Sequence, residues 1–284
     1  MRIDHITVKG SSKWNEDALI LHENHRVFGV VDGATSLVPF MGEGGETGGY
    51  LAAALVSDTV ARMLEQSGSE RPSLADMLAR ANDALKDGMA RQGVRTDRKE
   101  ELWSAGAVLI RIGETGIEYA QAGDCMLIAY YRDGSIRVVS RDQLAEVDRE
   151  TYRCWAEAVA EGITERDRLW ERVKPQIISG RDAANRPDGY AVLNGDPQLA
   201  DHLEYGRINR IHLKALLLMT DGLYAPKRAD EAPFDAEEAA ARIADMGIDA
   251  YARWVIGVEE NDPHCLLYPR VKMSDDKTAI WIEL

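Results

Sequence analysis

The feature that most constrains this chain is the stretch 30–36, where an apolar run stops abruptly at an aspartate. Val30 and Val31 end the run, Asp32 follows directly, and Gly33 comes next. A short apolar run predicts a buried strand, so its end delivers a carboxylate to the rim of a core. Glycine lets the backbone turn tightly there and bring its own carbonyl close to whatever the carboxylate holds. The stretch is therefore a candidate metal site.

A hairpin would bring two further acids to the same rim. Residues 18–21 and 26–31 predict two strands joined by a short polar turn. Glu16 and Asp17 stand just before the first strand, and Asp32 ends the second. We therefore expect these three side chains to meet at the open end of the hairpin.

The far end of the chain carries two fragments of the same kind. An apolar run over 215–220 leads into Asp221, and Asp275 and Asp276 stand immediately before a strand pattern over 277–284. Hard divalent cations such as Mg2+ and Mn2+ take oxygen ligands, and clustered carboxylates are otherwise costly to bury together. Acids at several strand ends therefore predict a site for two metal ions.

These acids lie in short motifs that resemble those of a known family. The motifs are N-E-D-A at 15–18, V-D-G-A at 31–34, A-G-D-C at 122–125, M-T-D-G at 219–222 and D-D-K-T at 275–278. In order, strand context and rough spacing they are similar to the motifs of the protein phosphatase 2C family, the metal-dependent serine/threonine phosphatases. The resemblance covers nearly the whole chain, from residue 3 to 284.

The resemblance implies a set of metal ligands. Asp32 would bridge two ions of Mn2+ or Mg2+. Glu16 and the carbonyl of Gly33 would complete one site, and Asp221 and Asp275 the other. Two such ions lower the pKa of a bridging water and neutralise charge on the phosphate during in-line attack. The implied reaction is therefore hydrolysis of a phosphate monoester.

Two neighbouring acids need separate assignments. Asp17 is expected just outside the ligands, where it orients a metal-bound water, so Asp32 and Asp17 are the predicted catalytic residues. Of the pair Asp275 and Asp276, we take Asp275 as the ligand. The family pattern places its metal aspartate three residues before a Ser or Thr, which is Thr278 here.

A third, weaker ion is implied at Asp124, within the A-G-D-C motif. The family often supplies another aspartate shortly after the M-T-D-G-like motif, but Ala225 stands at that position here. A third site should therefore be weak. The alternative reading of Asp124, as an aspartate that caps a turn, stays open.

The clearest departure from the family concerns the phosphate. An arginine usually stands four residues before the motif glutamate, and here that position is Ser12. Because the planar fork of arginine matches phosphate geometry better than an ammonium does, we expect weaker substrate binding. Lys13 and Lys9 are the nearest cations, and we predict that Lys13 partly replaces the arginine. Ala34 replaces a histidine often found after V-D-G, so water is left as the proton donor.

Mixed helix and strand periodicities predict an α+β fold. Apolar positions at helical spacing predict helices that begin near residue 48 and at about 74, and further helices over 235–246 and 250–260. Strand patterns over 103–140 predict one antiparallel meander, and 189–196 predicts a strand with a turn. Helices that flank two runs of antiparallel strands agree with the four-layer α-β-β-α sandwich of two antiparallel sheets that the resemblance implies.

No linker, repeat or low-complexity segment divides the chain. We expect a single catalytic domain over 1–284 with a helical, flap-like insertion at about 141–186. Many of the insertion's residues are charged, and its sequence leaves two alternatives open. Its helices either contact the substrate or a partner, or they cover an edge of the sheets.

Composition excludes several classes of partner. The chain has 48 acidic and 34 basic residues, a formal net charge of -14, which argues against nucleic acid and anionic membranes as partners. No apolar run approaches the roughly 18–20 residues of a membrane span, and the first residues lack a signal-peptide pattern. The three cysteines are far apart and indicate no disulfide framework. We therefore expect a cytoplasmic protein.

The predicted function is metal-dependent removal of phosphate from phosphoserine and phosphothreonine in protein substrates. Two alternatives remain: a regulatory module that keeps the fold and binds without turnover, and a phosphatase of small molecules. All the core carboxylates are present, which favours an enzyme, since buried acids are costly to keep without a metal. The sequence contains neither a G-x-S-x-G elbow nor an H-E-x-x-H motif.

Overall fold

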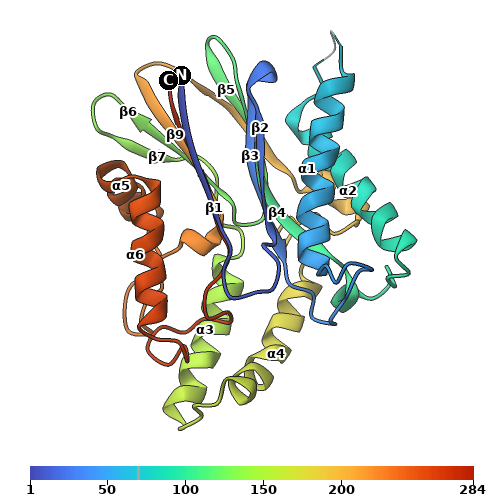
Figure 1. The fold of residues 1–284 in the computed structure, drawn as a ribbon, viewed down its shortest axis with the longest axis vertical. Coiled ribbons are helices and arrows are strands. Elements are labelled where there is room, and N and C mark those ends of the chain that lie inside the picture. Colours follow the sequence, from blue (N-terminus) through green and yellow to red (C-terminus); the bar gives the residue numbers. More distant parts are fainter. Residues whose placement is uncertain (69–70) are drawn as a thin grey trace.

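The computed structural model describes residues 1–68 and 71–284. Its strands form two antiparallel sheets of five strands each (Figure 1). The first sheet has the order β1 (Arg2–Val8), β10 (Lys277–Glu283), β9 (Leu213–Met219), β6 (Met126–Tyr131) and β7 (Ile136–Val138). The second has the order β2 (Asp17–His22), β3 (Val27–Ala34), β4 (Ser104–Ile112), β5 (Gly116–Ala122) and β8 (Glu204–Asn209).

Helices cover the outer face of each sheet. α1 (Gly48–Gln66) and α2 (Leu74–Arg91) pack on the second sheet, and α5 (Ala236–Met246) and α6 (Ile248–Glu260) pack on the first (Figure 1). Between the sheets lies a buried apolar layer that includes Phe28 and Val108 from one sheet and Leu216 and Ile280 from the other. The predicted four-layer α-β-β-α sandwich is therefore confirmed. Among the described helices, none is both long and apolar enough to cross a membrane.

Helices α1, α2 and α5 begin where their sequences supply a side-chain cap. The side chain of Thr47 accepts a hydrogen bond from the Tyr50 amide at the start of α1, and Ser73 does the same for the amide of Asp76 in α2. Asp235 accepts from two amides of α5. Such caps satisfy backbone donors that have no partner within the helix.

The prediction of one meander over 103–140 is wrong. β4 and β5 pair in the second sheet, whereas β6 and β7 belong to the first. The chain crosses between the sheets at Gly123, whose φ of 85° favours glycine. Local patterns mark strands and turns, but they do not record which sheet a strand joins, so the crossing was missed. It places Asp124 between the two sheets.

The segment 189–196 also differs from its prediction, because it forms only isolated bridges instead of a strand. Side-chain amides take the place of a neighbouring strand. Asn185 both accepts from the amide of Val192 and donates to its carbonyl, at 2.9 and 3.0 Å. Asn82 Oδ1 accepts from the amides of Asn194 and Gly195. The polar backbone is satisfied without a ladder.

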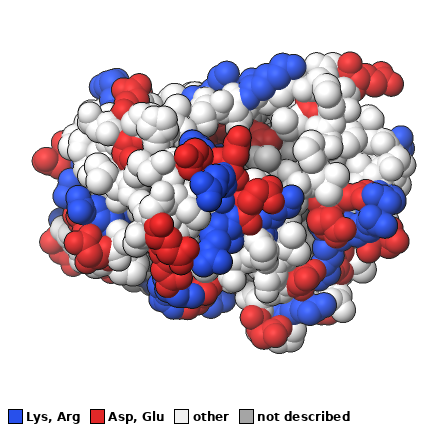
Figure 2. Space-filling model, turned by 90° about the horizontal axis from the view of Figure 1, so that it is seen from below, with Lys and Arg blue, Asp and Glu red and all other residues white. Residues whose placement is uncertain are grey.

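The segment 141–186 contains α3 (Ala145–Ala160) and α4 (Arg166–Asp182), which form a hairpin beyond one end of both sheets (Figure 1). Figure 2 views the molecule from that end, and basic and acidic side chains alternate across it. The apolar side of the hairpin packs on Cys265, in the loop before β10. Trp155 Nε1 donates to the Cys265 carbonyl at 2.8 Å. The hairpin therefore supports that loop.

Candidate metal centre

The β2–β3 hairpin brings the first group of predicted residues together. Asp17 and Asp32 are direct partners in the antiparallel register. The amide of Gly33 donates to the carbonyl of Glu16 at 2.9 Å. Glu16, Asp17, Asp32 and Gly33 therefore lie side by side at the open end of this hairpin, as predicted from the apolar run that ends at Asp32.

The ends of β9 and β10 join this group from the other sheet. Thr220, which follows β9, donates from its hydroxyl to Asp17 Oδ2 at 2.9 Å and accepts from the Thr278 amide at 3.1 Å. Asp221 comes directly after Thr220. Thr220 thus links the ends of both sheets, and it places Asp221 beside Asp17 and Asp32.

Asp276 and its neighbour Asp275 have different surroundings. The buried carboxylate of Asp276 accepts from the amides of Gly10 and Glu16, each at 2.7 Å. It holds the β1–β2 connection against the start of β10. Asp275 is only half-buried and is directed to the acidic group. This arrangement supports the choice of Asp275 over Asp276 as ligand, which stays a prediction.

The carboxylates are close enough to perturb one another. Burial, followed by repulsion from Asp221 and Asp17, raises the pKa of Asp32 well above its usual value. Burial also raises the pKa of Asp17, and repulsion from Asp275 and Asp221 adds to the shift. The pKa of Asp221 is raised by burial and by Asp275. Bound cations would relieve these costs, because they favour the ionised form.

Divalent metal ions suit this group of residues in two respects, although the described His, Cys, Asp and Glu side chains include no group of three or more already arranged to hold an ion. First, the available donors are oxygens, which Mg2+ and Mn2+ prefer. Second, Glu16 Oε1 is buried and has no hydrogen-bond partner among the described residues. Its other oxygen accepts from the Thr35 hydroxyl at 2.6 Å. A buried carboxylate oxygen without a partner is costly, and a cation would satisfy it.

Lys272 also reaches the carboxylates, although no sequence pattern indicated it. Its Nζ lies 2.6 Å from Asp275 Oδ1 and 3.6 Å from Glu16 Oε2. Burial alone would lower the pKa of Lys272, but Asp275, Asp32 and Glu16 raise it well above its usual value. Lys272 comes from a loop without periodicity, which offers no pattern for predicting its direction.

Lys13, the residue predicted to bind phosphate, lies over the ring of Trp14. Its Nζ is 5.9 Å from the ring centroid of Trp14, a position that allows a cation–π contact. Within the described residues it forms no ion pair with the predicted metal ligands. Its role at the phosphate stays a prediction.

The segment 141–186, which contains the α3–α4 hairpin, contributes acids that were not predicted. Burial and repulsion from Asp221 raise the pKa of Asp148 to about 8, and burial raises that of Asp142 to about 6. Both repel Asp124, whose own pKa is raised first by burial and then by Asp221. The Tyr224 hydroxyl donates to the Asp124 carbonyl at 2.7 Å. Asp124 is therefore buried next to Asp221, and its role at a third ion stays a prediction.

Arg181, near the end of α4, is a second cation that the sequence did not indicate. Its Nη2 donates to the Thr35 carbonyl at 2.7 Å, and its Nη1 is buried without a partner among the described residues. Thr35 in turn donates to Glu16. The hairpin is thus connected to the Glu16 side of the centre.

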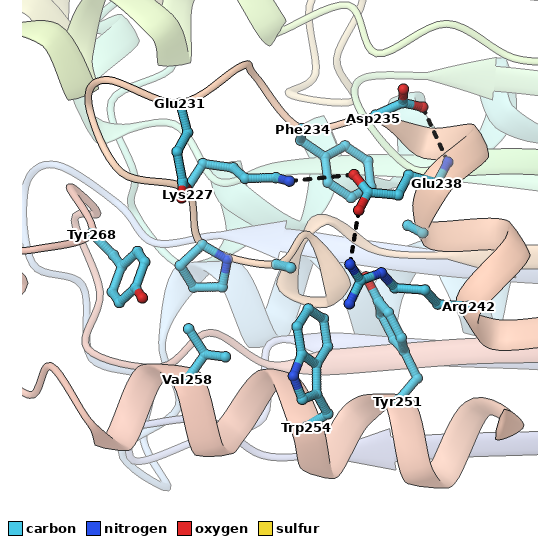
Figure 3. A pocket seen from close by; sticks show the side chains of 13 residues that line it. Lys227, Glu231, Phe234, Asp235, Glu238, Arg242, Tyr251, Trp254, Val258 and Tyr268 are labelled. Atoms are coloured by element: carbon cyan, nitrogen blue, oxygen red, sulfur yellow. Dashed lines mark hydrogen bonds and ion pairs between the residues drawn. The ribbon is translucent and has the colours of Figure 1, made fainter.

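A hollow lies elsewhere, between the loop 225–235 and helices α5 and α6 (Figure 3). Its charges are paired: Glu238 accepts from Lys227 at 3.4 Å and from Arg242 at 2.9 Å. Arg242 also lies 5.0 Å from the ring centroid of Trp254. The hollow shares no residue with the carboxylate group, so we do not place the reaction there.

Comparison with known families agrees with this geometry. The model of the family described as protein phosphatase 2C matches residues 9–246. The chain belongs to the protein phosphatase 2C family. By this membership it is classed with the protein phosphatases, as its motifs predicted. No curated protein matches the chain closely enough to count as a relative.

Solved structures share the fold at low sequence identity. PppA of Pseudomonas aeruginosa, described as a regulatory component of a type VI secretion system, has a TM-score of 0.57 and 18% identity over 99% of this chain and 96% of its own. The Mycobacterium tuberculosis serine/threonine phosphatase PstP has the same TM-score, 0.57, and identity, 18%, over 100% and 98%. A PstP catalytic domain in complex with two manganese ions has a TM-score of 0.55 and 17% identity over 99% and 97%.

Proposed function

We propose that this chain removes phosphate from phosphoserine and phosphothreonine in protein substrates, with two ions of Mn2+ or Mg2+ as cofactor. The observation that carries the proposal is the convergence of buried and half-buried carboxylates from the ends of both sheets, with one Glu16 oxygen that has no partner among the described residues. Membership of the protein phosphatase 2C family supports the reaction class. The PstP domain described with two manganese ions supports the choice of metal.

In the proposed centre, Glu16 and the carbonyl of Gly33 would hold one ion, Asp221 and Asp275 would hold the other, and Asp32 would be a ligand of both. When bound, the ions supply a water of lowered pKa and neutralise charge on the phosphate. The chain's own contribution is to hold these oxygens in place before the substrate arrives.

Asp17 would orient the attacking water. Its Oδ2 accepts from the Thr220 hydroxyl, so the carboxylate has a fixed direction. The protein surface at the hairpin end alternates in charge (Figure 2). A phosphoprotein can therefore approach this end in spite of the chain's net charge of -14.

The test uses the variants Asp32→Asn and Asp221→Asn, with the exposed Asp87→Asn of α2 as control. Hydrolysis of phosphopeptides should require Mn2+ or Mg2+, stop with chelator, and fall about a hundredfold or more in both variants but not in the control. Mn2+ should raise the melting temperature of the parent by mass action. Hydrolysis that persists in excess chelator would refute the two-metal proposal.

A further inference from the structure

We infer that Lys272 binds the phosphate group of the substrate. This inference rests on the proposed phosphatase function and adds a residue to it. Lys272 stands at a point where ligands of both proposed ions meet: its Nζ contacts Asp275 at 2.6 Å and Glu16 at 3.6 Å. A phosphate held between two ions would lie against the same carboxylates, within reach of this ammonium.

Lys272 keeps N–H donors free for a substrate. A lysine ammonium has three N–H donors; one is hydrogen-bonded to Asp275, and Glu16, at 3.6 Å, is only within ion-pair distance. Lys277, from the same part of the chain, differs because all three of its donors are used. Its Nζ donates to Glu259, Ser274 and the Asp275 carbonyl, at 3.0, 3.1 and 2.8 Å. Lys277 is fully buried and Lys272 only half-buried. Lys277 is therefore structural, while Lys272 keeps a donor and access to solvent.

The backbone on both sides of Lys272 is held by partly buried hydrogen bonds. The Val271 carbonyl accepts from Arg166 of α4 at 2.7 Å, and the Met273 carbonyl accepts from Arg270 at 3.0 Å. Arg270 is buried and forms an ion pair with Asp262 at 3.0 Å. A side chain carried between two such anchors loses less freedom when it binds a ligand.

The Lys272 loop also lies against the chain that leads into the centre. Ser11 donates from its amide and its hydroxyl to the Ser274 carbonyl, at 2.8 and 2.9 Å. A Cβ added to Gly10 would meet backbone atoms of residues 274 and 275, so the two segments are in close contact. Ser12, which provides no cation, therefore sits beside the loop that does. Lysine binds phosphate as a point charge.

The test measures phosphate binding separately from turnover. The variants are Lys272→Met, Lys272→Arg and the control Lys174→Met, a partly exposed lysine of α4 that pairs with Glu171. Binding of inorganic phosphate to the Mn2+-loaded protein, and of Mn2+ alone, is measured by calorimetry. We expect Lys272→Met to weaken phosphate binding and raise KM about tenfold or more, with a smaller change in kcat. Mn2+ binding should not weaken, and Lys272→Arg should recover most of the phosphate affinity.

Two results would overturn the inference. In the first, Lys272→Met binds phosphate as the parent does. In the second, Lys272→Met binds Mn2+ more weakly than the parent does, but it binds phosphate as well as the parent once Mn2+ is saturating. That result would mean that Lys272 only orients the metal ligands. Failure of the proposed function is distinguishable, because a parent that binds phosphate without hydrolysing any phosphoester would contradict the function while the binding measurements still report on Lys272.

Discussion

The buried ion pair between Lys277 and Glu259 permits a quantitative test of how the centre is held. Lys277 Nζ lies 2.9 Å from Glu259 Oε2, and the side chains are 1% and 5% exposed. The pair joins α6 to the start of β10, and Lys277 also donates to the carbonyl of Asp275. Removal of one partner leaves a buried charge without compensation, which typically costs about 3–5 kcal/mol. We therefore expect Lys277→Met to lower the free energy of unfolding by about that amount.

Denaturant unfolding in chelator measures this loss without the added stability of bound metal. The matched control is the double variant Lys277→Met/Glu259→Leu, which removes both charges and should be far less destabilised than Lys277→Met. The coupling energy from the double-mutant cycle isolates the pair. A loss below about 1 kcal/mol in Lys277→Met, or a double variant that loses the sum of the two single losses, would show that the pair contributes little.

The α3–α4 hairpin and the sheet crossing give the other two predictions. Burial raises the pKa of Asp148 to about 8, so the folded chain keeps a proton that the unfolded chain releases, and stability is lost as the pH rises from about 4 to about 8. Asp148→Asn should therefore stabilise the metal-free protein by about 1–3 kcal/mol at pH 8.5 and much less at pH 5. If the difference in unfolding free energy between variant and parent is the same at both pH values, this prediction is contradicted. Asp124→Asn should lower kcat more than it raises KM for phosphopeptides, and a third ion should bind weakly; tight binding of three Mn2+ in calorimetry would show that the site was underestimated.

Much of the centre could be predicted because its residues follow periodic segments. Glu16, Asp17 and Asp32 flank strands whose alternation fixes the register, so their meeting follows from the hairpin alone. Asp221 likewise follows a buried strand. Lys272 could not be found in this way, because its loop is held by contacts with Arg166 and Ser11, which are distant in sequence.

The sheet crossing after β5 shows the same limit at the level of the fold. β5 and β6 are both largely buried, and each reads as a strand followed by a turn. Whether the next strand pairs with its predecessor or joins the other sheet depends on which apolar face is already covered, and this is a property of the packed layers. Sequence patterns therefore predicted both of these strands but placed β6 beside the wrong neighbour.

The α3–α4 hairpin connects these points, since it touches the centre from both sides. Arg181 donates to the carbonyl of Thr35, whose hydroxyl holds Glu16, and Arg166 donates to the carbonyl of Val271, next to Lys272. Thr35 contacts Glu16 directly, and Val271 is the residue that precedes Lys272. Because interiors are close-packed and transmit small shifts, a displacement of the hairpin would move Glu16 and Lys272 together. The hairpin is therefore part of the framework that sets the spacing between the two ends of the centre, beyond any cover it gives to the sheets.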